Sequence, residues 1–324
     1  MTEGTPKKKL KFELGGNLSI LIGLIVLCIF FGIATDKFFT AKNLINMLLQ
    51  VSNIGTVAIG GMFVILTGGI DLSSGSMTAI LGLFMAGFCV DNGMPVLLAI
   101  ALGFLIGLGL GALNGLSVTR LGMSAFIVTL AMQSMLRGLG NVYSMGTSIF
   151  GMPKSFNYVG SSMVFGVIPL PVILLIILFV IAHLVLSRTV FGHQVYAIGG
   201  NRDAAYLAGI PVRRVELITY VIAGFTSAIT ALVLTGRLAS ALPTAAEGLE
   251  FSAISAIVIG GGSLSGGKGN MLGTFIGVLI IGVLNNGLNL LNISPFWSQF
   301  AQGLIIFMAV LIDAVNQRRL QAKA

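Results

Sequence analysis

Ten runs of mostly apolar residues, separated by short polar stretches, follow one another along the 324-residue sequence. A helix needs about 20 apolar residues to cross the hydrocarbon core of a bilayer. The runs lie at residues 18–35, 44–67, 75–90, 95–118, 124–143, 168–187, 213–236, 250–262, 271–291 and 296–313. Charged residues make up only 9% of the chain, whereas water-soluble domains carry about 25%. The sequence therefore predicts an all-α fold, a polytopic transmembrane helical bundle of about ten spans that forms one membrane domain over residues 1–324.

The Lys and Arg residues indicate how this bundle is oriented, because cytoplasmic loops carry an excess of them. With the N-terminus in the cytoplasm, 13 of the 18 basic residues fall on the cytoplasmic side, and ten spans return the C-terminus there. They are Lys7, Lys8, Lys9, Lys11, Arg120, Arg188, Arg202, Arg213, Arg214, Lys268, Arg318, Arg319 and Lys323, against Lys37, Lys42, Arg137, Lys154 and Arg237 on the other side. We therefore predict a cytoplasmic tail at residues 1–17, a cytoplasmic loop at 188–212 and two cytoplasmic termini. The net charge of +8 reflects this topology, and we expect no nucleic-acid partner.

Two of the ten runs are short and lie beside glycine- and serine-rich stretches. The strings are "ILTGGIDLSSGSM" near 66–90 and "VIGGGSLSGGKGNM" near 250–270. Backbone that leaves the helical pattern at membrane depth must be shielded by protein or line a wet cavity. A pair of broken or short helices in the two halves of a chain is a known pointer to a transport site.

Glycines recur every four residues in the run at 95–118, at Gly103, Gly107, Gly111 and Gly115. Small residues at this spacing let two transmembrane backbones approach closely. The pattern predicts tight helix packing within the chain, with a seam between two copies as the alternative.

Residue patterns for catalysis are not recognisable. Gly262, Gly267 and Lys268 match part of a phosphate-binding loop, but glycine stands where the magnesium-binding Ser or Thr should follow. His183, His193 and the acidic residues show no metal-ligand spacing. We expect no enzyme activity, no metal site and no cofactor on this chain.

The segment at 187–220 predicts a short amphipathic helix in the cytoplasmic loop. Asn201 or Asp203 is placed to cap it, and Gly209 followed by Pro211 would end it. Small and apolar side chains form one side, namely Ala204, Ala205, Leu207 and Ala208. The helix could be part of an ordinary solvated loop, or it could insert into a groove of a soluble partner.

The chain resembles the membrane subunits of bacterial ABC importers for monosaccharides of the ribose type. The resemblance rests on "ILTGGIDLSSGS", "YAIGGNRDAAYLAGIPV" and the stretch "PTAAEGLEFSAISAIVIGGGSLSGGKGNMLGTFIGVLIIGVLNNGLNLL". It implies a multi-pass permease of the bacterial inner membrane that pairs with a second copy. It also implies a cytoplasmic ATPase subunit that binds ATP and Mg²⁺, and an extracytoplasmic sugar-binding protein. The resemblance marks Gly199, Gly200, Asn201, Asp203, Ala204, Ala205, Leu207, Gly209 and Pro211 as the coupling helix that contacts the ATPase.

Polar side chains within the spans are the natural candidates for a sugar path, because they usually face the bundle interior or a cavity. The candidates are Asn53, Asn114, Gln133, Asn285, Asn286 and Asn289. Each of them could instead form an ordinary interhelical hydrogen bond.

Asp71, followed by Ser73 and Ser74, is placed to cap the short helix at 75–90. The alternative is a proton or cation relay with Lys268, as in a secondary transporter. A proton- or cation-coupled secondary transporter and a membrane receptor or scaffold therefore remain as alternative functions, and the transported monosaccharide, ribose or a related sugar, stays open.

Overall fold

The computed structural model describes the backbone of residues 8–321 and the side chains of residues 18–311. The helices are α1 (Lys8–Ala34), α2 (Ala41–Leu66), α3 (Ser74–Val90), α4 (Val96–Thr119), α5 (Ala125–Tyr143), α6 (Lys154–Ser161), α7 (Leu170–Arg188), α8 (Val190–Gly200), α9 (Arg202–Leu207), α10 (Val212–Leu238), α11 (Leu249–Ile259), α12 (Met271–Leu290) and α13 (Pro295–Gln321). Two-residue strands pair antiparallel as β1 (Ile149–Phe150) with β4 (Ser240–Ala241) and β2 (Met163–Val164) with β3 (Ile168–Pro169). The predicted all-helical membrane bundle is confirmed.

Each of the ten apolar runs lies in a helix of its own. Among the described residues, five helices are long and apolar enough to cross a membrane, namely α2, α4, α7, α10 and α12, and the apolar parts of α1, α3, α11 and α13 are shorter. The run at 124–143 forms α5, which carries Gln133 and Arg137. The helix α1 begins at Lys8, so part of the stretch at 1–17 that we predicted to be a tail is helical. The apolar run marks only the part of a helix that lies in the hydrocarbon region, and the helix can continue beyond it. Lys7 and Lys323 lie outside the described residues.

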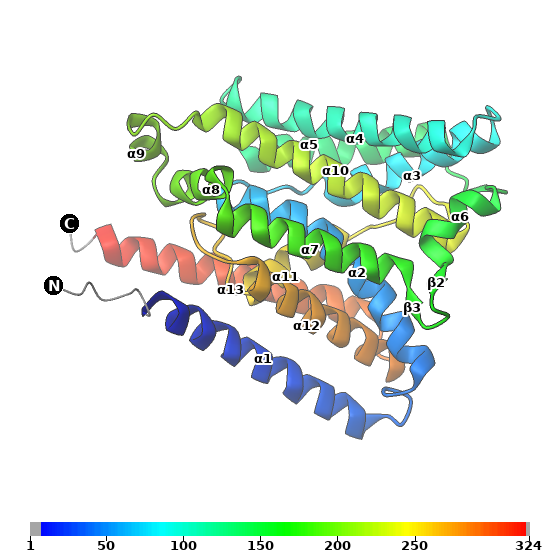
Figure 1. Cartoon of the computed structure of the whole chain (residues 1–324), viewed down its shortest axis with the longest axis horizontal. Coiled ribbons are helices and arrows are strands. Elements are labelled where there is room, and N and C mark those ends of the chain that lie inside the picture. The colour runs from blue at the N-terminus through cyan, green and yellow to red at the C-terminus, as the bar shows by residue number, and fades with distance from the viewer. Residues whose placement is uncertain (1–7, 322–324) are drawn as a thin grey trace.

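The first turns of α1, the last turns of α13 and the pair α8–α9 lie at the same end of the bundle (Figure 1). The opposite end holds α6 and the strands β2 and β3 (Figure 1). This arrangement agrees with an even number of crossings.

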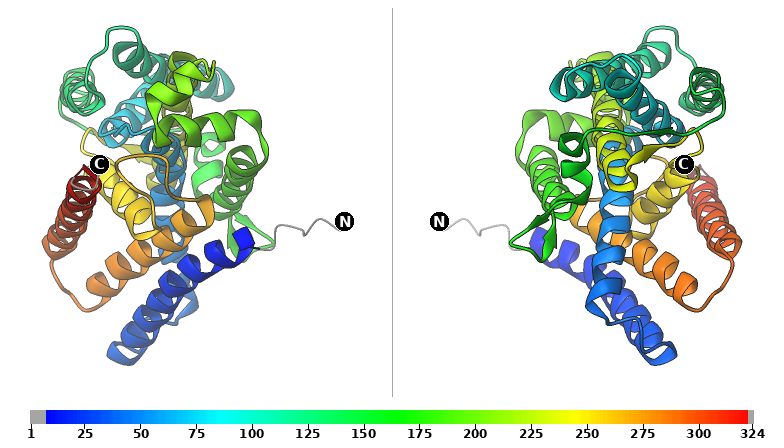
Figure 2. Two further views of the ribbon diagram at one scale, coloured as in Figure 1. Left: turned by 90° about the vertical axis from the view of Figure 1, so that its left-hand side faces the viewer. Right: turned by 90° about the vertical axis from the view of Figure 1, so that its right-hand side faces the viewer.

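Among the described residues, two large apolar cores lie side by side, and Val64 of α2 forms a small third cluster with Tyr220 and Ala223 of α10. Buried residues of α2, α7, α11 and α12 form the larger core, and those of α3, α4, α5, α6 and α10 contribute to the second. The helices α2 and α10 pack against each other and join the two cores. In the end-on views of Figure 2, α1 and α12 lie at the bottom of the molecule and α13 lies along one side.

The glycine face of α4 packs against neighbouring helices of the same chain. A Cβ added at Gly107 would lie 2.9 Å from the carbonyl oxygen of Gly224, and one added at Gly115 would lie 2.7 Å from Leu217. Gly111 approaches the backbone of Tyr220, and Gly103 approaches Met85 of α3. The α4 glycines therefore serve tight internal packing, chiefly against α10.

The two short helices are confirmed. The 17-residue α3 and the 11-residue α11 would be about 25 Å and 16 Å long, and both fall short of a hydrocarbon core of about 30 Å. Non-helical links at residues 67–73 and 260–270 connect α2 to α3 and α11 to α12. The two similar glycine- and serine-rich stretches of the sequence therefore form these non-helical links instead of continuing as helix.

Candidate functional site

A polar cavity of about 250 Å³ lies between α2, α11, α12 and α13. It is near the C-terminal end of α12, at the end of the bundle that lies away from α9 (Figure 1). Its polar lining consists of Gln50, Glu247, Ser252, Asn285, Asn289, Ser298, Gln299 and Gln302. Amide and hydroxyl groups of this kind can both donate and accept hydrogen bonds, as a polyhydroxylated neutral ligand requires.

Asn285 is the centre of a hydrogen-bond network along one side of this cavity. Its Oδ1 atom accepts a hydrogen bond from the Ser298 hydroxyl and a longer one, at 3.4 Å, from Nε2 of Gln302. The Ser252 hydroxyl in turn donates to Oε1 of Gln302 at 3.2 Å. The network connects α11, α12 and α13, so that a shift of α11 would change the shape of the cavity.

The six predicted path residues are not brought together. Only Asn285 and Asn289 line the polar cavity. Asn286 forms two reciprocal hydrogen bonds of 2.9 Å with Asn43, which tie α12 to α2. Asn53 is buried in α2, and its Oδ1 atom has no hydrogen-bond partner among the described residues.

Sequence analysis did not select most of the polar cavity lining. Asn285 was selected because it is an amide within a predicted apolar run. The same is true of three other lining residues, Gln50, Gln299 and Gln302. Applied to every amide in the runs, that criterion would also have found them. The convergence of α2, α11 and α13 on α12 is a tertiary feature that no local pattern encodes.

The other candidates lie around the link at 67–73. Oδ1 of Asp71 accepts hydrogen bonds from the backbone N–H of Ser73 at 2.8 Å and from its hydroxyl at 2.6 Å. Nδ2 of Asn114 donates to the same hydroxyl at 2.9 Å. Asn114 of α4 therefore holds the link in place through Ser73.

The capping geometry of α3 differs from the one predicted. The side chain of the N-cap residue Ser73 accepts no hydrogen bond from the first turn of α3. Asp71 lies two residues before the N-cap residue Ser73, so its carboxylate reaches the N–H of Ser73 and forms a local turn. Ser74 is buried as the first residue of the helix.

A second buried carboxylate, Glu250, lies against the start of α3. It is in the first turn of α11, is 2% exposed, and accepts a hydrogen bond of 2.7 Å from Nε2 of Gln133. Any side chain at Gly75, in the first turn of α3, would overlap Oε2 of Glu250. Helix N-termini favour negative charge, and this carboxylate belongs to the first turn of α11 and lies against the first turn of α3.

Sequence analysis missed Glu250 and named Lys268 as the one possible partner of Asp71. The structure corrects this, because Lys268 is an exposed residue of the link at 260–270 and Glu250 is buried. Gln133 is thus explained as a partner of Glu250 rather than as a lining residue of the polar cavity. The available signal was Glu250 itself, an acidic residue in the string "EGLEF" that stands at the start of the apolar run at 250–262.

The short helix predicted in the loop at 188–212 is present as α9. Asn201 caps it, since its Oδ1 atom accepts from the N–H of Ala204 at 2.9 Å, and Gly209 follows its end with a φ of 80°. Gly199 and Gly200 end α8, and Pro211 directly precedes α10.

Three of the four residues on the predicted apolar side of α9, namely Ala204, Leu207 and Ala208, are exposed, whereas Ala205 is buried. Ala205 is 4% exposed and packs into the larger core, whereas Tyr206 and Leu207 are 72% and 84% exposed. The face available to another molecule therefore carries large apolar side chains. Asp203 and Ala204 are exposed beside them.

A cavity of about 960 Å³ lies beside this face, between α9 and the ends of α4 and α10. Arg120, Arg213 and Arg214 contribute to its lining. Arg202 also lines it, but Nε of Arg202 forms an ion pair with Oε1 of Glu216 at 2.8 Å. The surface around α9 thus combines exposed apolar groups with an excess of positive charge.

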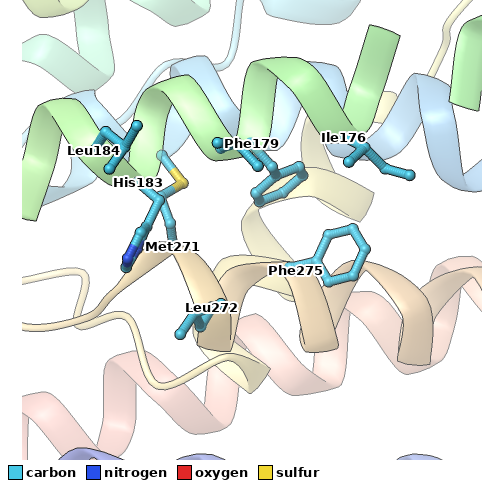
Figure 3. Close-up of a pocket in the computed structure, with 8 residues that line it drawn as sticks. Ile176, Phe179, His183, Leu184, Met271, Leu272 and Phe275 are labelled. Atoms are coloured by element: carbon cyan, nitrogen blue, oxygen red, sulfur yellow. The ribbon is translucent and has the colours of Figure 1, made fainter. Parts of the chain in front are cut away.

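A third hollow, an apolar groove between α7 and α12, has a different chemistry (Figure 3). Its lining is apolar and includes Ile176, Phe179, Met271 and Phe275. Among the described lining residues, only His183 has a polar side chain. The groove offers few hydrogen-bond partners for a sugar and suits a lipid tail better.

Comparison of the sequence with known proteins assigns the chain to a family. The family model "Branched-chain amino acid transport system / permease component" matches residues 43–310. The chain belongs to this permease family. As a permease component, it is not itself an enzyme.

Curated relatives resemble the permease over nearly their whole length. The ribose import permease of Bacillus subtilis is 45% identical, over 95% of this chain and 96% of the relative. The ribose import permease of Escherichia coli K12 is 40% identical over 92% and 93%, and the D-allose permease of that strain is 35% identical over 96% of both chains. No solved structure matches the permease.

Proposed function

We propose that the permease is the transmembrane subunit of an ATP-driven bacterial importer for ribose or a closely related monosaccharide. The observation that carries the proposal is the amide- and hydroxyl-lined cavity at the end of the bundle opposite α9. The near full-length similarity to permeases named for ribose and allose supports it. A branched-chain amino acid, which the family description names, has an apolar side chain that this polar lining would serve poorly.

The size of the cavity supports a small ligand. Sites for drug-sized ligands measure about 300–1,000 Å³, so a volume of about 250 Å³ suits something smaller. A monosaccharide is small, neutral and rich in hydroxyl groups. We assign Asn285 and Asn289 to the sugar path, together with the other polar lining residues of this cavity.

A second copy of the permease would complete the path. The polar cavity is partly open, and polar side chains cannot face lipid hydrocarbon at low cost. The neighbouring face of α13 exposes Phe296, Trp297 and Phe300. Pairing of two copies through α13 would cover these aromatic side chains and enclose a polar path between the copies.

The ATPase subunit would bind at α9. The helix α9, which exposes Tyr206 and Leu207, lies at the same end of the bundle as the first turns of α1 and the last turns of α13, and the basic residue count assigns that end to the cytoplasm. ATP and Mg²⁺ would be bound by this partner, and a sugar-binding protein would deliver the sugar at the opposite end, near the polar cavity. The family assignment replaces the secondary-transporter and receptor alternatives.

The test is sugar uptake by proteoliposomes that contain the permease, its ATPase subunit and its binding protein. We expect ATP-dependent ribose uptake, which Asn285→Leu should reduce at least about tenfold, because it removes the acceptor that orders the cavity lining. Asn43→Leu is the matched control for a buried amide outside the cavity, and after correction for folded complex it should retain uptake. Uptake without ATP, or equal uptake by both variants per folded complex, would contradict the proposal.

A further inference from the structure

Three separate parts of the chain meet at one backbone junction, which consists of Gly199, Leu66 and Gly267. The N–H of Gly267, in the link at 260–270, donates a hydrogen bond of 2.9 Å to the carbonyl oxygen of Leu66, the last residue of α2. This bond satisfies one of the carbonyl groups that a helix end leaves without an intrahelical partner. The two glycine-rich links that look alike in sequence thus touch in space.

Gly199, near the end of α8, closes this junction. A side chain at Gly199 would overlap both the Leu66 oxygen and the Gly267 nitrogen. A Cβ at Gly266 would lie 2.9 Å from the nitrogen of Gly68 and 3.1 Å from the Cα of Gly199. The backbones therefore touch directly, without flexible side chains between them.

A side-chain hydrogen bond also holds α8 to the same link. The hydroxyl of Tyr196 donates to the carbonyl oxygen of Gly269 at 2.9 Å. Gly269 lies two residues before α12, the helix that contributes Asn285 and Asn289 to the polar cavity. The C-terminal half of α8 is thus attached to the start of a cavity-lining helix.

On its other side, α8 leads directly into α9. Asn201 is the one residue between the two helices; its N–H donates to Ala197 of α8, and its side chain caps α9. A displacement of α9 must therefore move Gly199, which has no free space against Leu66 and Gly267. Such movement would reach both broken-helix links together.

We propose that Gly199 and Tyr196 are positioning residues that transmit movement of α9 to the links at 67–73 and 260–270, and so to the polar cavity. This inference rests on the proposed function, in which the ATPase binds at α9. On this inference, the contact between α8 and the links acts during transport and does not only stabilise the fold.

The test compares Gly199→Ala with Gly109→Ala in α4, because an added Cβ at Gly109 would meet nothing within 4 Å and Gly109 lies outside both the α9 region and the polar cavity. The quantity measured is ATP hydrolysed per sugar imported, in proteoliposomes with ATPase and binding protein, together with the amount of ATPase bound. We expect Gly199→Ala to bind the ATPase normally and to raise this ratio at least about fivefold, the lower end of typical coupling effects. Gly109→Ala should match the wild type.

Tyr196→Phe keeps the ring and removes the hydroxyl, so it tests the inference even if Gly199→Ala does not fold. We expect a rise of about two- to threefold in ATP used per sugar, in the range of one neutral hydrogen bond. The inference would be overturned if Tyr196→Phe, and Gly199→Ala where it folds, used the same amount of ATP per sugar as the wild type. It would also be overturned if uptake fell only in proportion to the loss of assembled complex. Failure of the wild-type complex to couple uptake to ATP would instead overturn the proposed function.

Discussion

The links at 67–73 and 260–270 begin from similar glycine- and serine-rich sequences and are stabilised in different ways. Most residues of the first link are buried, and side chains hold it, since Asp71, Ser73 and Asn114 form a chain of hydrogen bonds. The second is held by backbone groups, with Ser263 N–H donating to Lys268 C=O at 3.0 Å and Gly267 N–H donating to Leu66 C=O. Its glycines at 261, 266, 267 and 269 have positive φ values. Similar strings can therefore serve either as a side-chain clamp or as a backbone turn.

The largest effect is expected from a side chain within the backbone turn. Gly267→Val places a branched residue at a φ of 70°, where an added Cβ lies 2.8 Å from backbone atoms of Gly199 and Gly200. Left-handed strain and overpacking together should cost about 2–5 kcal/mol. Thermal unfolding of the purified permease in detergent measures this loss. Gly261→Val shares the positive φ without the contacts and should cost only the strain, about 1–2 kcal/mol; equal losses would show that the contacts contribute nothing.

A smaller effect is expected from removing the side-chain clamp. Asp71→Ala leaves the buried N–H and hydroxyl of Ser73 without their acceptor and should cost about 1–3 kcal/mol. Asp71→Asn keeps an acceptor oxygen and should retain most of the stability and uptake. Unfolding midpoints and sugar uptake per folded complex are the measurements. An Asn variant that is as inactive as the Ala variant, with normal yield in both, would instead indicate that Asp71 must titrate.

The smallest effect is expected at the charged residue of the second link. Lys268 is exposed and contributes its backbone carbonyl to the turn, so Lys268→Gln should change stability by less than about 0.5 kcal/mol. Uptake should equal that of the wild type. A loss comparable to that of Asp71→Ala would mean that the two links are more alike than their hydrogen bonds indicate.

Much of the fold could be predicted because membrane spans are local in sequence. Apolar length located the ten helices that contain the apolar runs, and the turn chemistry of Asn201 and Gly209 located α9, whereas α6 and α8 were not predicted. The burial of Ala205 could not be predicted, since it depends on which face of a six-residue helix meets the core.

The candidate site was less predictable, for a related reason. An amide within a span can pair with a neighbouring helix, as Asn286 does, or line a cavity, as Asn289 does, and the sequence looks the same in both cases. Glu250 was missed because its partners, Gln133 and the space beside Gly75, come from α5 and α3. Helix pairing decides these roles.

The contact between α4 and α10 has a consequence for how permeases of this kind can diversify. Gly107 and Gly224 bring backbone against backbone, so no side chain there can be exchanged to adjust the fit. If the polar cavity forms the sugar path, as proposed, a new sugar preference would arise there, through exchange of lining side chains such as Gln50, Asn289 and Gln299. Among permeases for different sugars, we expect the α4–α10 seam to tolerate almost no substitution while the cavity lining varies with the cargo.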